Sequence, residues 1–256
     1  RFVDDHTVAV DTAEGEKLFK ADRIFINTGA TPFVPPVEGL TIGGAIQTSE
    51  TIMNLEEYPE SLVIIGSGFI GLEFAATYAQ FGTKVTVIDV TEAFLPREDE
   101  DVAQAVKEQL EALGVTFNLG VQLKAVHQEG GKAVVEATTG EGAPVAFTAD
   151  AVLVATGRRA NVQGLDLDKA GVELTERGAI KVNEFLQTNV AHIFAMGDVN
   201  GGPQFTFVSL DDFRIVKRFL AGDTTYSTKQ RAKFPTATFI NPPLASVGLN
   251  EKQAKE

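Results

Sequence analysis

One stretch near the first third of the 256-residue chain limits its fold more than any other. Four consecutive apolar residues, Leu62–Ile65, run directly into a Gly-x-Gly-x-x-Gly motif, and a helical pattern follows from Phe69 to Phe81. Consecutive apolar positions are typical of a parallel strand that is covered on both faces. A strand, a glycine turn and a helix in this order predict the first unit of a dinucleotide-binding α/β sheet.

Each glycine of the motif has a separate physical task. Gly66 permits the tight turn after the strand, Gly68 lets phosphates approach the backbone, and Gly71 allows the helix to pack closely on the strand. The first helical N–H groups, which belong to Phe69, Ile70 and their neighbours, carry partial positive charge that attracts a pyrophosphate. We therefore expect these five residues to bind a dinucleotide, although a glycine turn can also serve packing alone.

The next predicted strand, Val85–Ile88, ends at Asp89, roughly 20 residues after the motif begins, as a dinucleotide site requires. A carboxylate at this position accepts hydrogen bonds from ribose hydroxyls and repels the 2′-phosphate of NADP. The nearby cations, Lys84 and Arg97, do not directly follow the strand, where a 2′-phosphate would be bound. The sequence thus predicts NAD(H) in preference to NADP(H), with a solvated carboxylate at the strand end as the alternative for Asp89.

Strands and helices alternate from residue 62 to residue 117, which indicates a parallel sheet with right-handed crossovers. Short β-type runs separated by glycine-rich turns follow from residue 121 to residue 147, and they indicate an antiparallel β-meander. A buried parallel-type strand, Ala151–Ala155, resumes the first pattern. Together these segments predict a Rossmann-like α/β domain made of a parallel sheet and a meander.

Two strand ends of related sequence bracket this predicted domain. Arg23–Asn27 is followed by Thr28 and Gly29, and Ala151–Ala155 is followed by Thr156 and Gly157. We interpret them as the places where the chain leaves and re-enters a second domain. The expected division is residues 1–46 and 156–223 for the two parts of the outer domain, 47–155 for the inserted domain, and 224–256 for a linker and the start of a further domain.

Composition excludes several classes of function. The formal net charge of −13 opposes binding to nucleic acid or to anionic membrane surfaces. No apolar run is long enough to cross a bilayer, and the first residues lack a signal-peptide pattern, so we expect a cytoplasmic protein. With no cysteine, the chain has no redox dithiol or thiolate metal site. Its three histidines, His6, His127 and His192, stand at unrelated spacings, and we expect no metal site.

The motifs together resemble the pyridine nucleotide–disulfide oxidoreductases, a family that includes lipoamide dehydrogenase, glutathione reductase and mercuric reductase. Their order along the chain is the order of the family. The run Gln204–Asp212 is most similar to the branch of reactive-chlorine-resistance flavoproteins. The matching stretches are residues 26–30 with Pro32, 64–73, 94–96, 155–161, 193–198 and 245–249.

The resemblance implies roles for residues outside the glycine motif. Asp198 matches the aspartate that hydrogen-bonds the ribityl chain of FAD, and Glu73 matches the glutamate that lies near the flavin and nicotinamide rings. On sequence alone Glu73 is equally an ordinary glutamate of a helix surface, but the resemblance makes it the expected catalytic residue. Cofactor contacts are also implied for the segments that join the FAD-binding and NAD-binding domains, namely Thr28, Gly29, Thr156, Gly157 and Arg158.

Two parts of the family pattern have no counterpart in these 256 residues, namely the first glycine-rich FAD turn and the redox cysteine pair. Of the family's C-terminal dimerisation domain, residues 234–256 resemble only the opening, and its catalytic histidine is absent. We therefore expect the NAD(H)-binding middle of a longer enzyme, inserted into a partial FAD-binding domain. The full-length protein would be a homodimer that contains FAD, passes hydride from NADH to flavin, and sends electrons to a disulfide or similar acceptor.

By itself the 256-residue chain is expected to bind small-molecule cofactors only, to lack FAD and to be inactive. Two alternatives stay open. The first is a flavin-dependent NADH oxidase or ferredoxin-reductase-type enzyme, and the second is a non-catalytic NAD-binding module that senses redox state. The sequence does not identify the electron acceptor.

Overall fold

A five-stranded parallel sheet is the largest element of the computed structural model, which describes residues 1–231 and 233–255. Its strand order is β5-β12-β6-β7-β8, and all four pairings are parallel. The predicted α/β class is confirmed, and β5 is a strand that the sequence pattern did not predict. The strands are β5 (Ile46–Thr48), β6 (Ser61–Ile65), β7 (Lys84–Asp89), β8 (Thr116–Leu119) and β12 (Ala151–Val154).

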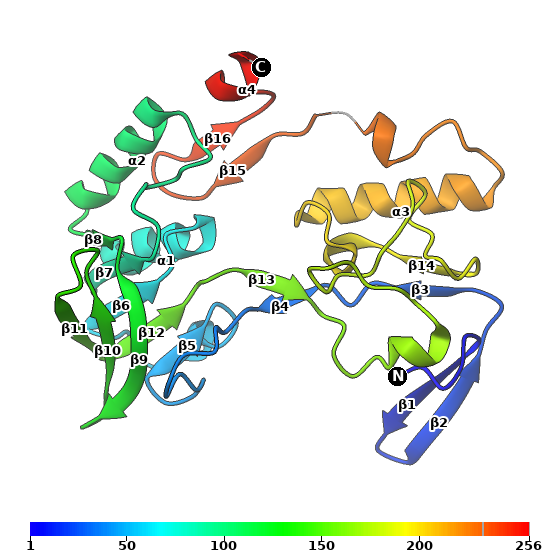
Figure 1. Cartoon of the computed structure of the whole chain (residues 1–256), viewed down its shortest axis with the longest axis horizontal. Helices are drawn as coiled ribbons and strands as arrows, with labels where there is room; N and C mark the ends of the chain where they lie inside the picture. The colour runs from blue at the N-terminus through cyan, green and yellow to red at the C-terminus, as the bar shows by residue number, and fades with distance from the viewer. Residues whose placement is uncertain (232, 256) are drawn as a thin grey trace. The chain divides into compact units, whose positions relative to one another are not determined.

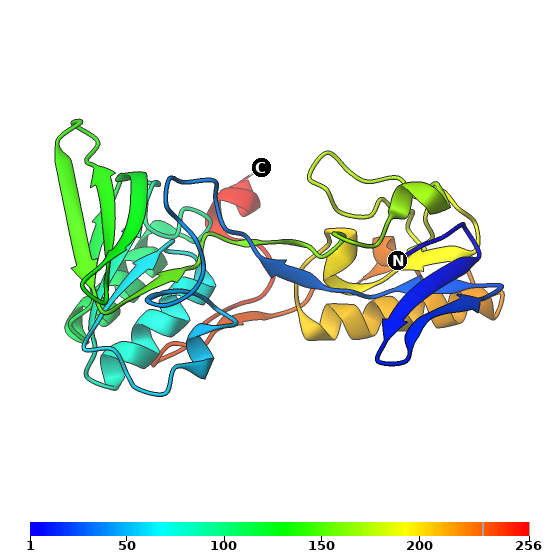
Figure 2. The ribbon, with the colours of Figure 1, turned by 90° about the horizontal axis from the view of Figure 1, so that it is seen from below.

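The two faces of this sheet are covered by different structures (Figure 2). Leu62 and Ile64 of β6 pack in one buried cluster with the helices α1 (Phe69–Gln80) and α2 (Glu100–Ala112). The alternate residues Val63 and Ile65 pack in a second cluster with the β-meander. This arrangement explains the continuous apolar run of β6, since both sets of side chains are buried. The meander consists of β9 (Gln122–Glu129), β10 (Lys132–Thr138) and β11 (Pro144–Ala149).

The chain divides into two compact units. Unit 1 contains residues 1–31 and 158–231, and unit 2 contains residues 32–157 and 233–255, as far as the structure describes them. The first boundary therefore lies at residues 31/32, whereas the sequence predicted 46/47. The reason is packing, because Val37, Leu40, Ile42 and Ala45 contact the buried cluster between sheet and meander.

Residues 233–255 also belong to unit 2 (Figure 1). Ile240 is buried in the cluster that contains α1 and α2, and Gln109 Nε2 donates to the carbonyl of Pro242 at 3.1 Å. The sequence predicted a linker and a further domain over 224–256, of which residues 232 and 256 lie outside the described residues. This segment contains η4 (Thr228–Gln230), β15 (Thr236–Thr238), β16 (Leu244–Ser246) and α4 (Glu251–Lys255).

Unit 1 is built around one parallel strand pair and a long helix. β3 (Ile24–Ile26) pairs with β14 (Ile193–Ala195), and α3 (Thr206–Leu220) packs on β14 through Ile215 and Val216. β1 (Thr7–Thr12) and β2 (Gly15–Lys20) form an antiparallel hairpin. The remaining elements of unit 1 are β13 (Arg158–Ala160) and the 3-10 helices η2 (Leu167–Ala170) and η3 (Gly197–Asn200). β4 (Ala30–Pro32) contains residues of both units, and η1 (Ile52–Asn54) lies in unit 2.

Across the described part of the chain, every helix is too short or too polar to pass through a lipid bilayer.

One carboxylate connects the parallel sheet to the meander. Asp150 Oδ2 accepts hydrogen bonds from the N–H and the hydroxyl of Ser61, at 2.9 and 2.6 Å, at the start of β6. Asp150 Oδ1 lies 2.8 Å from Nζ of Lys132 on β10. The hydrogen bond from Lys132, followed by those from Ser61, lowers the pKa of Asp150 to about 2. The group is therefore charged throughout the physiological range and fixes three chain segments to one another.

We predict that Asp150→Asn lowers the free energy of unfolding of unit 2 by about 1–2 kcal/mol at pH 7, because a neutral amide replaces a charged acceptor. The folded-state pKa of about 2 lies below the ordinary value of 3.8, so this stabilisation is present above about pH 4 and is lost as the pH falls toward 2. Urea denaturation followed by circular dichroism measures it. The difference between the two proteins should shrink between pH 7 and pH 3, and a constant difference would contradict the assignment.

Glu111→Gln is the matched control for Asp150→Asn. Glu111 forms an exposed ion pair with Lys107 on α2 of the same unit, with an N–O separation of 3.8 Å. Exposed pairs of this kind contribute little, so the change in unfolding free energy should stay below about 0.5 kcal/mol.

Candidate functional site

The glycine turn lies between the end of β6 and the start of α1, at the carboxyl edge of the parallel sheet. Gly66 has φ +113°, a backbone conformation that residues with a Cβ rarely adopt. Its N–H donates to the carbonyl of Ile88 on β7 at 2.8 Å, and a Cβ at this position would lie 2.9 Å from the carbonyl carbon of Ala155. Gly66 is thus required by the protein's own backbone geometry.

The other two glycines of the motif differ in what surrounds them. A Cβ on Gly71 would collide with the carbonyl oxygen of Gly66 and would lie 3.4 Å from Ile64 Cγ2. Gly68, in contrast, has an extended backbone with φ −73° and ψ 173°, and a Cβ there would meet nothing within 4 Å. The fold therefore requires glycine at positions 66 and 71, whereas open space lies beside the backbone at Gly68.

The start of α1 exposes polar backbone groups toward this open space. Gly68 is the N-cap residue and has no side chain that could accept the first helical N–H groups. The first turn contains no acidic side chain, and the first intrahelical bond runs from Leu72 N–H to Gly68 O at 3.0 Å. The N–H groups that precede Leu72, including those of Phe69 and Ile70, lack a partner within the helix and carry its positive partial charge.

Asp89 lies at the end of β7, beside the glycine turn. Its Oδ2 accepts from the N–H of Ser67 at 2.6 Å and from the Ser67 hydroxyl at 2.7 Å, and its Oδ1 accepts from Thr91 N–H at 2.8 Å. Burial by itself would raise the pKa of Asp89, but the hydrogen bonds from Ser67 and Thr91 outweigh burial and lower that pKa below its ordinary value. A charged, oriented carboxylate therefore stands next to the turn, and the role of Ser67 in holding it was missed from sequence.

Thr156 and Gly157 reach the same edge of the sheet because β12 pairs with β6. The N–H of Ala155 donates to Ile65 O at 2.9 Å, which places the end of β12 against the glycine turn. The hydroxyl of Thr156 donates to Phe33 O at 2.7 Å, and the N–H of Phe33 donates to Gly157 O at 2.9 Å. These bonds fix the chain at the point where it enters and leaves unit 2.

Glu73 lies on α1 and is partly exposed. Its Oε1 accepts a hydrogen bond from the N–H of Phe239, just after β15, at 2.8 Å. The segment that follows residue 233 thus reaches the side chain that the family resemblance implies to be catalytic. The sequence contained no sign of this contact, because the two residues lie 166 positions apart.

In unit 1 the parallel pairing of β3 with β14 brings the turn that contains Asp198 next to the segment that contains Thr28 and Gly29. A Cβ on Gly197 would lie 2.9 Å from Asn27 Oδ1, so the segments that follow the two strands are adjacent. Thr28 donates its hydroxyl to Asn161 O at 2.7 Å, and Asn161 N–H donates to Gly29 O at 2.9 Å. Arg158, on the strand before Asn161, donates from Nη2 to the carbonyl of Ala30. No described residue donates a hydrogen bond to the side chain of Asp198, which is partly buried.

Asp212 is a residue of this region that the sequence analysis missed. Its side chain is 2% exposed, and Oδ2 accepts from Gly197 N–H at 2.8 Å and from Asn200 Nδ2 at 3.0 Å. Arg231 forms an ion pair with Oδ1 of Asp212 and with Asp211. Asp212 therefore holds the turn that presents Asp198. Helical spacing could have revealed it, since Asp212 shares the buried face of α3 with Val208, Ile215 and Val216.

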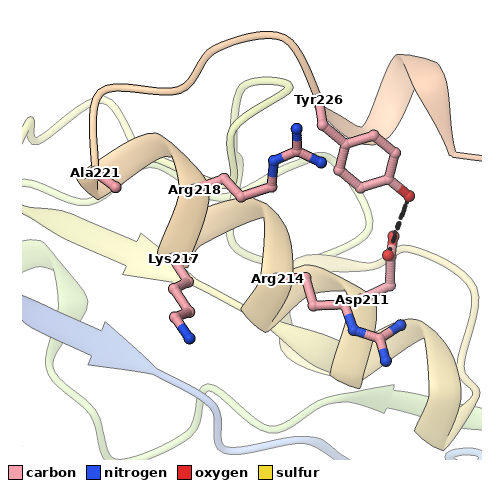
Figure 3. Close-up of a pocket in the computed structure, with 6 residues that line it drawn as sticks. All are labelled: Asp211, Arg214, Lys217, Arg218, Ala221 and Tyr226. Carbon is pink, nitrogen blue, oxygen red and sulfur yellow. Dashed lines mark hydrogen bonds between the residues drawn. The ribbon is translucent and has the colours of Figure 1, made fainter.

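A cavity of about 480 Å³ lies on another side of α3 (Figure 3). Its lining includes three cations from α3 and the ring of Tyr226, whose hydroxyl donates to Asp211 Oδ1 at 3.1 Å. The guanidinium of Arg218 lies 5.2 Å from the centre of the Tyr226 ring. None of the residues predicted for the dinucleotide site lines this cavity. The lining residues are Asp211, Arg214, Lys217, Arg218, Ala221 and Tyr226.

A glycine turn at the carboxyl edge of a parallel sheet, followed by a helix N-terminus and an acidic strand end, is the arrangement of a dinucleotide-binding domain. Comparison with known families agrees with this class. Residues 1–212 match the family described as pyridine nucleotide-disulphide oxidoreductase, and the chain belongs to that family.

Individual relatives support the same assignment. The Escherichia coli (strain K12) protein named "Probable pyridine nucleotide-disulfide oxidoreductase RclA" is 41% identical over 255 residues, covering 100% of this chain and 57% of the relative. Dihydrolipoyl dehydrogenase of Mycobacterium tuberculosis is 36% identical over 255 residues, covering 99% and 54%. The higher identity to RclA agrees with the branch predicted from Gln204–Asp212.

A solved structure is similar over nearly the whole chain. The Cu(II) complex of the HOCl-induced flavoprotein disulfide reductase RclA from Escherichia coli has a TM-score of 0.94 and 39% sequence identity, covering 99% of this chain and 56% of that chain. This chain therefore spans little more than half the length of the relatives that it matches.

We predict that Asp212→Ala lowers the free energy of unfolding of unit 1 by about 3–5 kcal/mol, because it leaves the partly buried Arg231 guanidinium without one of its two carboxylates and the N–H of Gly197 without an acceptor. Asp212→Asn keeps an acceptor for Gly197 and should lose less. Glu173→Gln, which removes an exposed ion pair with Lys181, is the control within unit 1. Urea denaturation followed by circular dichroism measures the unfolding free energy of each variant. The loss should be largest for Asp212→Ala, smaller for Asp212→Asn and smallest for Glu173→Gln, and equal losses for all three would contradict the prediction.

Proposed function

We propose that this chain is the NADH-binding central part of an FAD-dependent oxidoreductase, which passes hydride from NADH to flavin and electrons to a disulfide or similar acceptor. The observation that carries the proposal is the difference between the three glycines of the turn. Gly66 and Gly71 are needed by the fold, but the open space at Gly68 serves no contact within the chain. A glycine kept free of any Cβ at a helix N-terminus is what close approach of a pyrophosphate requires.

The choice of NADH over NADPH rests on Asp89. Its carboxylate is oriented by Ser67 and Thr91 and has a lowered pKa, so it is charged at neutral pH. A charged carboxylate at the end of the second strand accepts hydrogen bonds from ribose hydroxyls and repels a 2′-phosphate. The surrounding backbone N–H groups attract the pyrophosphate of either cofactor, so the Asp89 side chain alone would distinguish NADH from NADPH.

The flavin part of the proposal concerns unit 1. Asp198 would accept a hydrogen bond from the ribityl chain, and the segment after β3 with Thr28 and Gly29 would lie along the cofactor. Asp212 would act through the turn, since it holds the N–H of Gly197 beside Asp198. FAD, when bound, supplies the acceptor for hydride. We also propose that the full-length protein is a homodimer. Further FAD contacts would come from residues beyond these 256, so this chain alone would not retain FAD.

Glu73, Thr156, Gly157 and Arg158 complete the proposed site. Glu73 would lie near the nicotinamide, and its hydrogen bond from Phe239 N–H would fix the carboxylate in one orientation. Thr156 and Gly157 would hold the end of β12 at the cofactor, because both are bonded to the backbone of Phe33. Arg158 would hold the backbone of Ala30, to whose carbonyl it donates.

We predict that Gly68→Val weakens NADH binding roughly 10–100-fold, the loss expected when a backbone N–H can no longer bond a charged phosphate. Since the backbone of Gly68 is extended and its surroundings are open, the variant should keep the unfolding temperature of the wild-type chain. NADH fluorescence titration and thermal denaturation measure the two quantities. Gly68→Ala, with a smaller side chain, should bind with intermediate affinity, and unchanged affinity in both variants would refute the phosphate site.

We predict that the wild-type chain prefers NADH to NADPH and that Asp89→Asn narrows this preference by about 5–10-fold, the difference between a charged and a neutral acceptor. Asparagine retains an oxygen that can accept from Ser67, so the turn should persist. Competitive binding of the two cofactors measures the preference. Glu141→Gln, in the exposed turn between β10 and β11, is the control of equal charge change. Tighter binding of NADPH than NADH by the wild-type chain would overturn the proposed specificity.

A further inference from the structure

Two of the three histidines, far apart in sequence, meet in unit 1. His6 precedes β1 and accepts the N–H of Ala21 through its backbone oxygen at 2.9 Å, and His192 precedes β14 and accepts the N–H of Ile24 in the same way at 3.0 Å. Their rings are stacked with centroids 3.9 Å apart and an interplanar angle of 2°. The hairpin that contains β1 and the strand β14 are thus brought together at one pair of imidazoles.

The hydrogen bonds of each ring define its tautomer. His6 Nδ1 lies 2.8 Å from the carbonyl oxygen of Ala21, and His192 Nε2 lies 2.7 Å from the carbonyl oxygen of Asp5. A carbonyl oxygen only accepts hydrogen bonds, so each of these nitrogens carries the proton. In the neutral rings, His6 Nε2 and His192 Nδ1 consequently carry lone pairs, and no described residue donates a hydrogen bond to either.

We propose that Asp5, His6 and His192 form a binding site for a divalent transition-metal ion, with Zn²⁺ as the best-matched candidate. A nitrogen of each histidine and a carboxylate oxygen of Asp5 lie within 4.8 Å of one another. Two imidazoles and one carboxylate are a ligand set that zinc uses, with water in the fourth position. Metal-binding histidines commonly donate their second N–H to a backbone carbonyl, which both rings here already do. The site is independent of the proposed nucleotide function.

Binding requires a local adjustment that the structure permits. With bonds of about 2.0–2.2 Å, tetrahedral ligand atoms lie about 3.4 Å apart, so the three atoms that lie within 4.8 Å of one another must approach by roughly 1.4 Å at most. The rings must also tilt out of their parallel stack, because imidazole lone pairs lie in the ring plane. The N–H···O bonds to Ala21 and Asp5 can serve as pivots, and the exposed Asp5 carboxylate can rotate. The carboxylate of Asp4, which accepts from His6 N–H at 2.8 Å, adds negative charge nearby.

Isothermal titration of the untagged 256-residue chain with Zn²⁺ tests the proposal. We expect one ion per chain, and at least ~10-fold weaker binding by His6→Ala, His192→Ala and Asp5→Asn, since loss of a ligand costs no less than loss of an outer partner. His127→Ala is the matched control, because His127 is the third histidine of the chain and lies on β9 in the other unit. It should bind Zn²⁺ as the wild type does.

Nitrogen NMR of the three imidazoles identifies the ligand atoms. Zn²⁺ should shift the signals of His6 Nε2 and His192 Nδ1 and leave His127 unchanged. Circular dichroism without metal checks that each variant folds. If a histidine variant does not fold, the Zn²⁺ affinity of Asp5→Asn tests the site, because the exposed Asp5 side chain can be changed without loss of the fold. Failure of the wild type to bind, or equal affinity in the wild type and Asp5→Asn, or loss of binding in His127→Ala, would overturn the proposal.

Discussion

The parallel pairing of β6 with β7 on one side and β12 on the other is the constraint on which unit 2 depends. It brings the ends of three strands to one edge, so that Gly66, Asp89 and Thr156 meet although they are separated by up to 90 positions in sequence. Gly66 donates a hydrogen bond to β7 and lies close to the end of β12. Its positive φ is what allows the backbone to turn at the point where the three strand ends meet. The nucleotide site that we propose is the open space left where these backbones converge.

Buried or half-buried carboxylates hold the turns at the strand ends in both units. Asp89 accepts the N–H of Ser67, Asp150 accepts the N–H of Ser61, and Asp212 accepts the N–H of Gly197. Each satisfies backbone donors that the adjoining strand cannot pair, and burial of an unpaired N–H is costly. Asp150 and Asp212 are also paired with a cation, Lys132 and Arg231 respectively, which offsets the cost of removing their charge from water.

The proposed functions depend on these supports in different ways. Nucleotide binding uses backbone groups at the start of α1, which the sheet fixes, and one oriented side chain, Asp89. Flavin contact at Asp198 depends on a turn held from α3 by Asp212. The proposed metal site uses neither support, because it lies where the hairpin of β1 and β2 meets the start of β14. The nucleotide site lies in unit 2, whereas the other two places lie in unit 1, so a change at Asp89 tests nucleotide binding separately from them.

The sequence by itself determined the glycine turn, the alternation of strands and helices, and the family, since these are properties of short consecutive segments. Only the tertiary structure decided which long-range partners meet. It added β5 to the sheet, assigned residues 32–46 to unit 2 through apolar side chains that pack against the buried cluster between sheet and meander, and joined Glu73 to Phe239. It also placed His6 against His192, which spacing along the chain did not indicate. The physical reason is that local patterns fix backbone conformation, whereas contacts across 100 or more positions depend on how whole elements pack.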